Sequence, residues 1–202
     1  MKVLGICCSP RKGGNTESLL EEALRGARQE GAEAYLYTVS GKNMQPCDGC
    51  RACARTGVCH IKDDMQELYI KMIAADAIIF GSPVFQYAMT THAKLIIDRS
   101  RAMRGPSVNQ LANKVGGVIA VGGSLGLIGV VKDLYFHILA NHMLPGDYVA
   151  LYALNKGEYK NSIEGVKATF DLGRQMARLA AMKFAYPADL MKHSHAYGTW
   201  DQ

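Results

Sequence analysis

Short apolar runs alternate with longer amphipathic segments along most of the chain. Residues 3–7 are apolar and end at a turn that contains serine, proline and a pair of glycines, which is typical of a strand. Over residues 16–29, leucine and alanine recur at three- and four-residue steps, the spacing of one buried helix face. Such patterns predict five strands, at residues 3–7, 34–39, 77–80, 115–121 and 148–153. They predict five helices, at residues 16–29, 63–75, 91–101, 130–142 and 162–184.

Five apolar strands separated by helices indicate a doubly wound α/β fold, in which a five-stranded parallel sheet is covered by helices on both faces. No linker or shift in composition divides the chain. We therefore expect one domain over residues 1–187, with a cysteine-rich loop at residues 44–62 inserted after the second strand. Residues 188–202, with His193 and His195, are expected to form a tail that is poorly packed or used in subunit contacts.

Polar residues with short side chains stand at two of the predicted helix starts. Asn15 or Thr16 is placed to cap the first helix. Asp63, with Gln66 three residues later, is placed to form a capping box at the second. Capping by itself is a sufficient explanation for the acidic pair Asp63 and Asp64.

Four cysteines stand within thirteen residues, in the spacing C-x2-C-x2-C-x5-C: Cys47, Cys50, Cys53 and Cys59. This spacing resembles half of a bacterial ferredoxin motif, in which closely spaced cysteines bind separate iron atoms of one cube. A single zinc ion needs all four sulfurs at about 2.3 Å from one point, and zinc sites usually take two cysteine pairs from distant loops. The pattern favours a [4Fe–4S] cluster held by the four thiolates; zinc, disulfides and idle thiols are the alternatives.

Composition narrows the cellular setting and the class of partner. The 202-residue chain has a net charge of +5 without a long lysine or arginine run, which argues against nucleic acid as its main partner. The first residues do not read as a secretion signal, and no apolar stretch is long enough to span a membrane. We expect a cytoplasmic protein whose thiols stay reduced and available to metal.

The loop after the first strand, residues 9–16, combines polar side chains with a basic pair and two glycines. Its hydroxyl and amide groups, its accessible backbone N–H groups and the positive end of the following helix predict a phosphate site. It lacks the Gly-Lys-Ser/Thr of a P-loop, and a polar turn with a helix cap is the alternative. The loop at residues 82–87 would suit the edge of a flat ring, with a hydrophobic turn as the alternative. The loop at residues 122–126 permits close backbone approach to a ligand, but Ser124 stands where the G-x-G-x-x-G fingerprint has its second glycine.

Four motifs stand in these regions: S-P-R-x-x-G-N-T at 9–16, D-D-M at 63–65, G-S-P-V-F at 81–85 and K-x-x-x-D-R at 94–99. Together they resemble the flavodoxin-like NAD(P)H-dependent FMN reductases. The compact cysteine set between the second strand and Asp63 is similar to that of the iron–sulfur flavoprotein branch of this superfamily. The resemblance covers about the first 125 residues, and the C-terminal third has no diagnostic motif.

This resemblance implies FMN as a cofactor. The phosphate would be held by Ser9, Arg11, Gly14, Asn15 and Thr16. The isoalloxazine ring would lie along Pro83, Val84 and Phe85, with Gly122, Gly123 and Ser124 closing the other side. Where a tyrosine often follows the Pro-Val pair, this chain has Phe85, a change that removes a hydroxyl and keeps ring stacking.

The leading interpretation is a redox protein in which ferredoxin or another small carrier reduces the cluster, and electrons pass to FMN and then to a small-molecule acceptor. The resemblance implies a homodimer or homotetramer in which the cluster of one subunit faces the flavin of another. The main alternative is an NAD(P)H-dependent FMN or quinone oxidoreductase without a cluster. A zinc-stapled, non-catalytic flavin-binding module is the third interpretation.

Three residues near these sites are expected to have no special role. Cys7 and Cys8 end the first strand, where a free cysteine behaves as a small apolar residue. His60 follows Cys59, and we expect an exposed side chain there, with replacement or tuning of a cluster ligand as the alternative.

Overall fold

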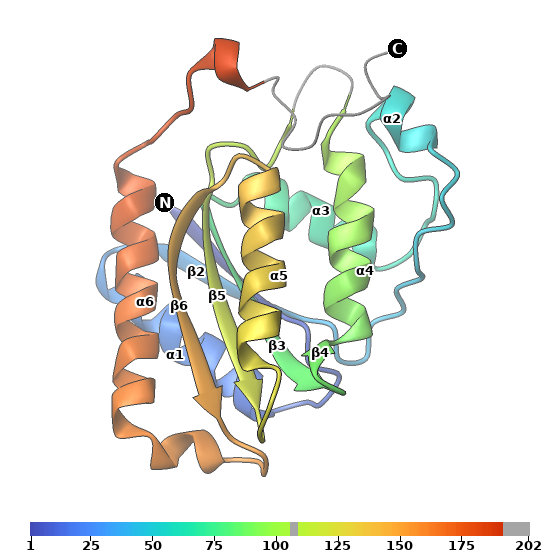
Figure 1. Ribbon diagram of the computed structural model, residues 1–202. Coiled ribbons are helices and arrows are strands. Elements are labelled where there is room, and N and C mark those ends of the chain that lie inside the picture. Colours follow the sequence, from blue (N-terminus) through green and yellow to red (C-terminus); the bar gives the residue numbers. More distant parts are fainter. Residues whose placement is uncertain (106–108, 192–202) are drawn as a thin grey trace.

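A computed structural model of the chain describes residues 1–105 and 109–191 (Figure 1). Five parallel strands form its sheet, in the order β2-β1-β3-β5-β6. Their bounds are β1 (Lys2–Cys7), β2 (Glu33–Thr38), β3 (Ala77–Phe85), β5 (Val115–Gly122) and β6 (Leu144–Tyr152). A two-residue strand, β4 (Ala88–Met89), pairs antiparallel with the end of β3. The predicted five-stranded parallel sheet is confirmed, and β4 was not predicted.

Helices cover both faces of this sheet, as predicted (Figure 1). On one face, α1 (Asn15–Gln29) and α6 (Ile163–Ala181) pack against each other and close one apolar core. On the other, α3 (Met65–Ala74), α4 (Thr91–Arg99) and α5 (Leu127–Ala140) close a second core. The remaining short helices are α2 (Ala52–Thr56), η1 (Ser100–Met103), η2 (Glu158–Asn161) and η3 (Ala188–Leu190). Within the described residues, no helix has both the length and the apolar character needed to cross a membrane.

The apolar patterns explain why these elements pack as they do. Each predicted apolar position of α1 is buried: Leu19, Leu20, Ala23, Leu24 and Ala27. All eight residues of β5 are buried, as expected for a central strand with helices on both sides. The apolar pattern of these two elements therefore matches their surroundings: α1 has one buried face, and β5 is buried on both faces.

Two glycines allow α1 and α6 to approach at backbone distance. A Cβ on Gly173 would overlap the carbonyl oxygen of Ala23, and a Cβ on Gly26 would overlap that of Phe170. The two contacts are reciprocal, since each helix presents a glycine to a carbonyl of the other. Any side chain at these positions would push the helices apart.

Several predicted boundaries were wrong. Strand β3 continues through the Gly81-Ser82-Pro83 segment to Phe85, because pairing with β5 extends as far as Pro83. Pairing with β1 stops at Gly81, so Pro83 lies where β3 has a parallel neighbour on one side only, a place where sheets tolerate proline. Helix α5 begins three residues before its predicted start, and β6 begins four residues before its own.

The capping predictions were also wrong in part. Gly14 is the N-cap of α1, and the Asn15 side chain instead bonds the distant loop after β6 through Asn155 O at 2.8 Å and Gly157 N at 2.7 Å. His193 and His195 lie outside the described residues, and their role in a tail remains a prediction.

Candidate functional site

A cavity of about 430 Å³ opens beyond the carboxyl ends of four parallel strands. The loops that follow β1, β3, β5 and β6 line it, at the point where the sheet order switches between β1 and β3. Ligands bind at this position in open α/β sheets. The predicted FMN contacts that line the cavity are Ser9, Arg11, Gly14, Asn15, Thr16, Pro83, Val84, Phe85, Gly122 and Gly123. Ser124 is exposed and does not line it.

One end of this cavity is positively charged and rich in donors. Arg11, Lys12 and Lys156 line it, and the helix that begins at Asn15 points its positive end there. Ser9 and Thr16, the first and last residues of the phosphate loop, are buried, with 4% and 2% of their surface exposed. This end is therefore built for an anion such as a phosphate monoester.

Lys156 was not predicted as a site residue. It comes from the loop after β6, and its Nζ lies 3.1 Å from the position that a Cβ on Gly13 would occupy. Gly13 has a φ of +64°, so its missing side chain serves both the turn and the close approach of this lysine. The tie from Asn15 to Asn155 and Gly157 holds the lysine loop against the phosphate loop. No local sequence signal joins positions 13 and 156.

The other end of the cavity is apolar. A Cβ on Gly122 would lie 2.9 Å from Val84 Cγ2, and a Cβ on Gly123 would lie 2.8 Å from Leu154 Cδ1. These glycines therefore let neighbouring side chains close on the cavity. Phe85 and Leu154 remain 40% and 66% exposed at its rim, where they offer apolar surface to a planar ring. A cationic end and an apolar end together fit a flavin phosphate.

Buried hydrogen bonds fix the loops on the β3 side of this cavity. Thr90 caps α4, and its hydroxyl donates to the carbonyl oxygen of Cys8 at 2.8 Å. Its backbone N–H donates to the Ser82 hydroxyl at 3.2 Å. The start of α4 is thereby joined to the ends of both β1 and β3.

A second, smaller cavity is lined by all four clustered cysteines, Cys47, Cys50, Cys53 and Cys59. The thiols are free; the first two residues are exposed and the last two are half-buried. The short helix α2 carries Cys53 and lies near the C-terminal end of α4 (Figure 1). The structure therefore brings the predicted ligands to one place.

The spacing of the sulfurs favours a cluster over a single metal ion. Among the described residues, no three of these sulfurs lie within 4.8 Å of one another. A tetrahedral zinc ion with sulfurs at about 2.3 Å would hold them about 3.8 Å apart. An iron–sulfur cube takes each thiolate at a different corner, so it tolerates the wider spread. The donor set thus fits an iron–sulfur cluster.

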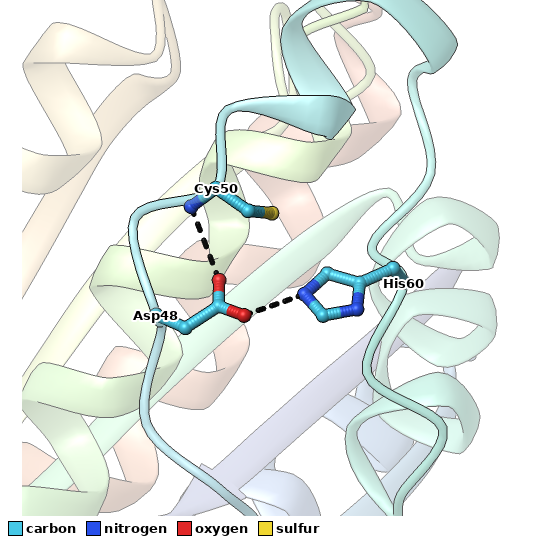
Figure 2. A group of neighbouring side chains, drawn as sticks. All are labelled: Asp48, Cys50 and His60. Carbon is cyan, nitrogen blue, oxygen red and sulfur yellow. Dashed lines mark hydrogen bonds and ion pairs between the residues drawn. The ribbon is translucent and has the colours of Figure 1, made fainter.

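Two arms of the cysteine loop are joined by Asp48 and His60. Figure 2 shows the Asp48 carboxylate between the backbone N–H of Cys50, at 3.1 Å, and the His60 ring nitrogen Nε2, at 2.7 Å. The His60 side chain is half exposed, as predicted, but it is paired with Asp48. The Cys50 sulfur, the Asp48 carboxylate and a His60 ring nitrogen all lie within 4.8 Å of one another, so the pair stands beside a predicted cluster ligand.

At the base of the loop, Asp63 does more than begin a helix. One oxygen accepts a bond from Met65 N at 3.1 Å, while the other accepts from Gln45 N at 2.7 Å and pairs with the buried Arg99. Gln66 donates to Ile61 O and does not complete a capping box. The explanation of Asp63 by capping alone was therefore wrong.

The pKa of Asp63 is held below its ordinary value. Burial by itself would raise the pKa of this carboxyl, but the bonds from Arg99 and the two backbone N–H groups outweigh that effect. Asp64 completes the base, since its carboxylate accepts from Asn43 N at 2.6 Å. Hydrogen bonds and an ion pair thus hold together the two ends of the cysteine loop.

Cys7 and Cys8 are placed as predicted, inside the two apolar cores with 0% and 1% of their surface exposed. Burial raises the pKa of Cys7 to about 11 and that of Cys8 further. A thiol with such a pKa stays protonated near neutral pH and is a poor metal ligand. Neither cysteine lines the cavity of the other four.

The two cavities lie at opposite ends of α4. Thr90 joins the start of this helix to the ends of β1 and β3 beside the larger cavity, and Arg99 at its end lines the cysteine cavity. Nine helical residues at 1.5 Å each separate the two ends by about 14 Å. The two sites are therefore independent in the elements that build them.

Comparison with known proteins identifies the family of this chain. The profile of the NADPH-dependent FMN reductase family matches residues 1–153. An iron–sulfur flavoprotein of Methanocaldococcus jannaschii is 37% identical over 192 residues, which cover 90% of this chain and 98% of that protein.

Solved structures confirm the flavodoxin-like fold. The structure of RosB with a bound 8-demethyl-8-formylriboflavin-5'-phosphate superposes with a TM-score of 0.73, at 19% identity over 90% of this chain and 79% of that one. A flavodoxin from the domain Archaea gives 0.58, at 14% identity over 90% of this chain and 99% of its own. The sequence matches carry the assignment further: this chain belongs to the NADPH-dependent FMN reductase family and, within it, to the iron–sulfur flavoproteins.

Proposed function

We propose that this flavoprotein binds FMN in the larger cavity and a [4Fe–4S] cluster between Cys47, Cys50, Cys53 and Cys59. The observation that carries the proposal is the cysteine cavity: four free thiols line one space, and among the described residues no three of their sulfurs lie within 4.8 Å of one another. When bound, the cluster supplies one-electron chemistry and the flavin supplies two-electron chemistry. The chain contributes binding, orientation and separation of the two groups.

In this proposal, a one-electron carrier such as ferredoxin delivers electrons at the cysteine cavity, and a small-molecule acceptor collects them at the flavin. Two of the four cysteine residues are exposed, which leaves this cavity accessible to a carrier. The reduced thiols that the proposal requires are typical of the cytoplasm.

The separation of the cavities supports an oligomer in which one subunit's cluster faces another's flavin. Within one chain, the length of α4 lies between them. A dimer or tetramer in which the chains run in opposite directions would bring unlike cavities together. Gel filtration of the active protein tests this, and a fully active monomer would contradict it.

The composition of anaerobically purified protein tests the cofactors. We expect flavin bands on a broad brown absorption, with about four iron and four sulfide per chain. A plain flavin spectrum after reconstitution with ferrous iron and sulfide would reject the cluster. Zinc near one per chain without sulfide would instead support the zinc-stapled module.

A second function is favoured by the match to the NADPH-dependent FMN reductase family: direct oxidation of NAD(P)H with reduction of a flavin or quinone. Rapid mixing separates the two functions. Fast flavin bleaching by NADPH would support the second, whereas slow bleaching with fast reduction by ferredoxin would support the first.

Lys156 is expected to contribute to the recognition of the FMN phosphate. Loss of a hydrogen bond to a charged group typically costs about 1.5–3 kcal/mol, so Lys156→Gln should weaken FMN binding by about 10- to 150-fold. Riboflavin, which lacks the phosphate, should bind both proteins equally, as measured by quenching of flavin fluorescence. Lys160→Gln is the control, since that lysine belongs to η2 and does not line the cavity. An equal loss for FMN and riboflavin would place Lys156 away from the phosphate.

A further inference from the structure

Arg99 is the last residue of α4 and its side chain is completely buried, with 0% exposed. The guanidinium donates from Nη1 to Asp63 Oδ2 at 2.5 Å and to the carbonyl oxygen of Gln45 at 2.9 Å. From Nη2 it donates to the carbonyl oxygen of Ile61 at 3.3 Å and to the sulfur of Cys59 at 3.5 Å. One cation thus contacts the chain before the first clustered cysteine and after the last.

These contacts leave one nitrogen of the guanidinium group without a hydrogen bond among the described residues. Within the described residues, its buried Nε has no hydrogen-bond partner, and its one ion pair is with Asp63. Burial of a charge is costly unless it is paired and hydrogen-bonded. A planar fork that reaches a carboxylate and a sulfur at once is specific to arginine. Arg99 lines the cysteine cavity and its Nη2 contacts the Cys59 sulfur, so a thiolate there would complete the pairing of the buried charge.

We infer that Arg99 tunes the reduction potential of the cluster by donating an N–H···S hydrogen bond to the Cys59 thiolate, an inference that rests on the proposed function. A cube held by four thiolates has a net charge of about −2, which becomes about −3 when it accepts one electron from the carrier. A nearby cation and a hydrogen bond to sulfur stabilise the more negative state. Arg99 therefore raises the potential and is a positioning residue that acts through Cys59.

A purely structural role for Arg99 makes a different prediction. If the guanidinium only closes the loop around Asp63, its removal changes how much cluster is held but leaves the potential of the remaining cluster unchanged. The electrostatic role predicts shifts of opposite sign for changes on the two sides of the ion pair. Removal of the donor to sulfur lowers the potential, and removal of the carboxylate that offsets the cation raises it.

The test measures the cluster potential by dye-mediated titration of reconstituted full-length protein, read by electron paramagnetic resonance. Arg99→Lys keeps the charge near Asp63 but lacks the fork that reaches Cys59. We expect its equilibrium constant for reduction to fall at least tenfold, which is about 59 mV for a one-electron couple. Asp63→Asn should shift the potential upward. Iron and sulfide are counted in each protein.

Arg101→Lys is the matched control, because it makes the same charge-conserving change. Arg101 lines the same cavity and carries the same charge, but its Nη1 donates to the carbonyl oxygen of Arg104 and, in the described part of the chain, it makes no bond to a cysteine sulfur. The cluster potential of this control should change by less than that of Arg99→Lys.

Each outcome of this test decides between the two roles. The inference would be overturned if the cluster potential shifted equally in the Arg99 and Arg101 variants. It would also be overturned if the cluster potential of Asp63→Asn were unchanged or lower. Failure of both Arg99→Lys and Asp63→Asn to load iron would assign the pair to loop closure alone. Failure of the unmodified chain to load iron would reject the cluster itself and with it the proposed function.

Discussion

Replacement of any one clustered cysteine with serine is expected to remove nearly all iron and sulfide while FMN stays bound. The four cysteines line one cavity, and loss of one thiolate leaves a corner of the cube without its ligand. The flavin cavity is built by other loops at the far end of α4. Substitutions at sites more than about 10 Å apart usually act independently, so FMN affinity should change by less than about 0.5 kcal/mol.

Iron, sulfide and FMN per chain, counted after anaerobic reconstitution, provide the measurement for these serine variants. Cys7→Ala is the control, because Cys7 is a buried thiol outside the cysteine cavity and its loss should leave iron in place. Joint loss of FMN and iron would show that the two sites are coupled. Full iron in a serine variant would remove that cysteine from the ligand set.

Gly173→Ala is expected to cause the largest loss of stability among single-methyl changes. The new Cβ would overlap the backbone oxygen of Ala23, so relief requires α1 and α6 to separate. Overpacking typically lowers the free energy of unfolding by about 1–3 kcal/mol and occasionally more. Because backbone atoms cannot move aside as a flexible side chain can, we expect a loss of about 3 kcal/mol here. Gly26→Ala should have the same sign, because its Cβ would overlap the backbone oxygen of Phe170.

Urea unfolding of the cofactor-free chain, followed by circular dichroism, measures this effect. Gly129→Ala is the matched control: it also adds one methyl to a helix, but the nearest atom, Tyr87 O, lies at 3.8 Å. Alanine is favoured over glycine in a helix, so this control should be neutral or more stable by up to about 1 kcal/mol. An unchanged unfolding midpoint for Gly173→Ala would contradict the close approach of the two helices.

The predictable parts of the fold depend on patterns that are local in the chain. The apolar period of α1 and the unbroken apolar run of β5 predict both elements with nearly their observed bounds. The end of β3 was missed because pairing with β5 continues past Gly81, and pairing is a property of two strands. The glycine and proline near the end of β3 predict a break in the chain and give no sign of this pairing.

The candidate sites likewise contain some residues that are close in sequence and others that only the fold brings together. The four cysteines are close in sequence, so their spacing alone brought them to one predicted centre, and the phosphate loop is likewise one short segment. Lys156 meets Gly13 across most of the chain, and Arg99 meets Asp63 across 36 positions. Both contacts arise only when the sheet order has placed the loops, which a single sequence does not reveal.

The loop base formed by Asp63, Asp64 and Arg99 needs no metal for its own hydrogen bonds. We therefore expect a newly synthesised chain to close this base before iron arrives, so that iron is delivered to a cysteine loop whose two ends are already held. Cells starved of iron should then accumulate a yellow, folded precursor that resists proteolysis and turns brown once iron is restored.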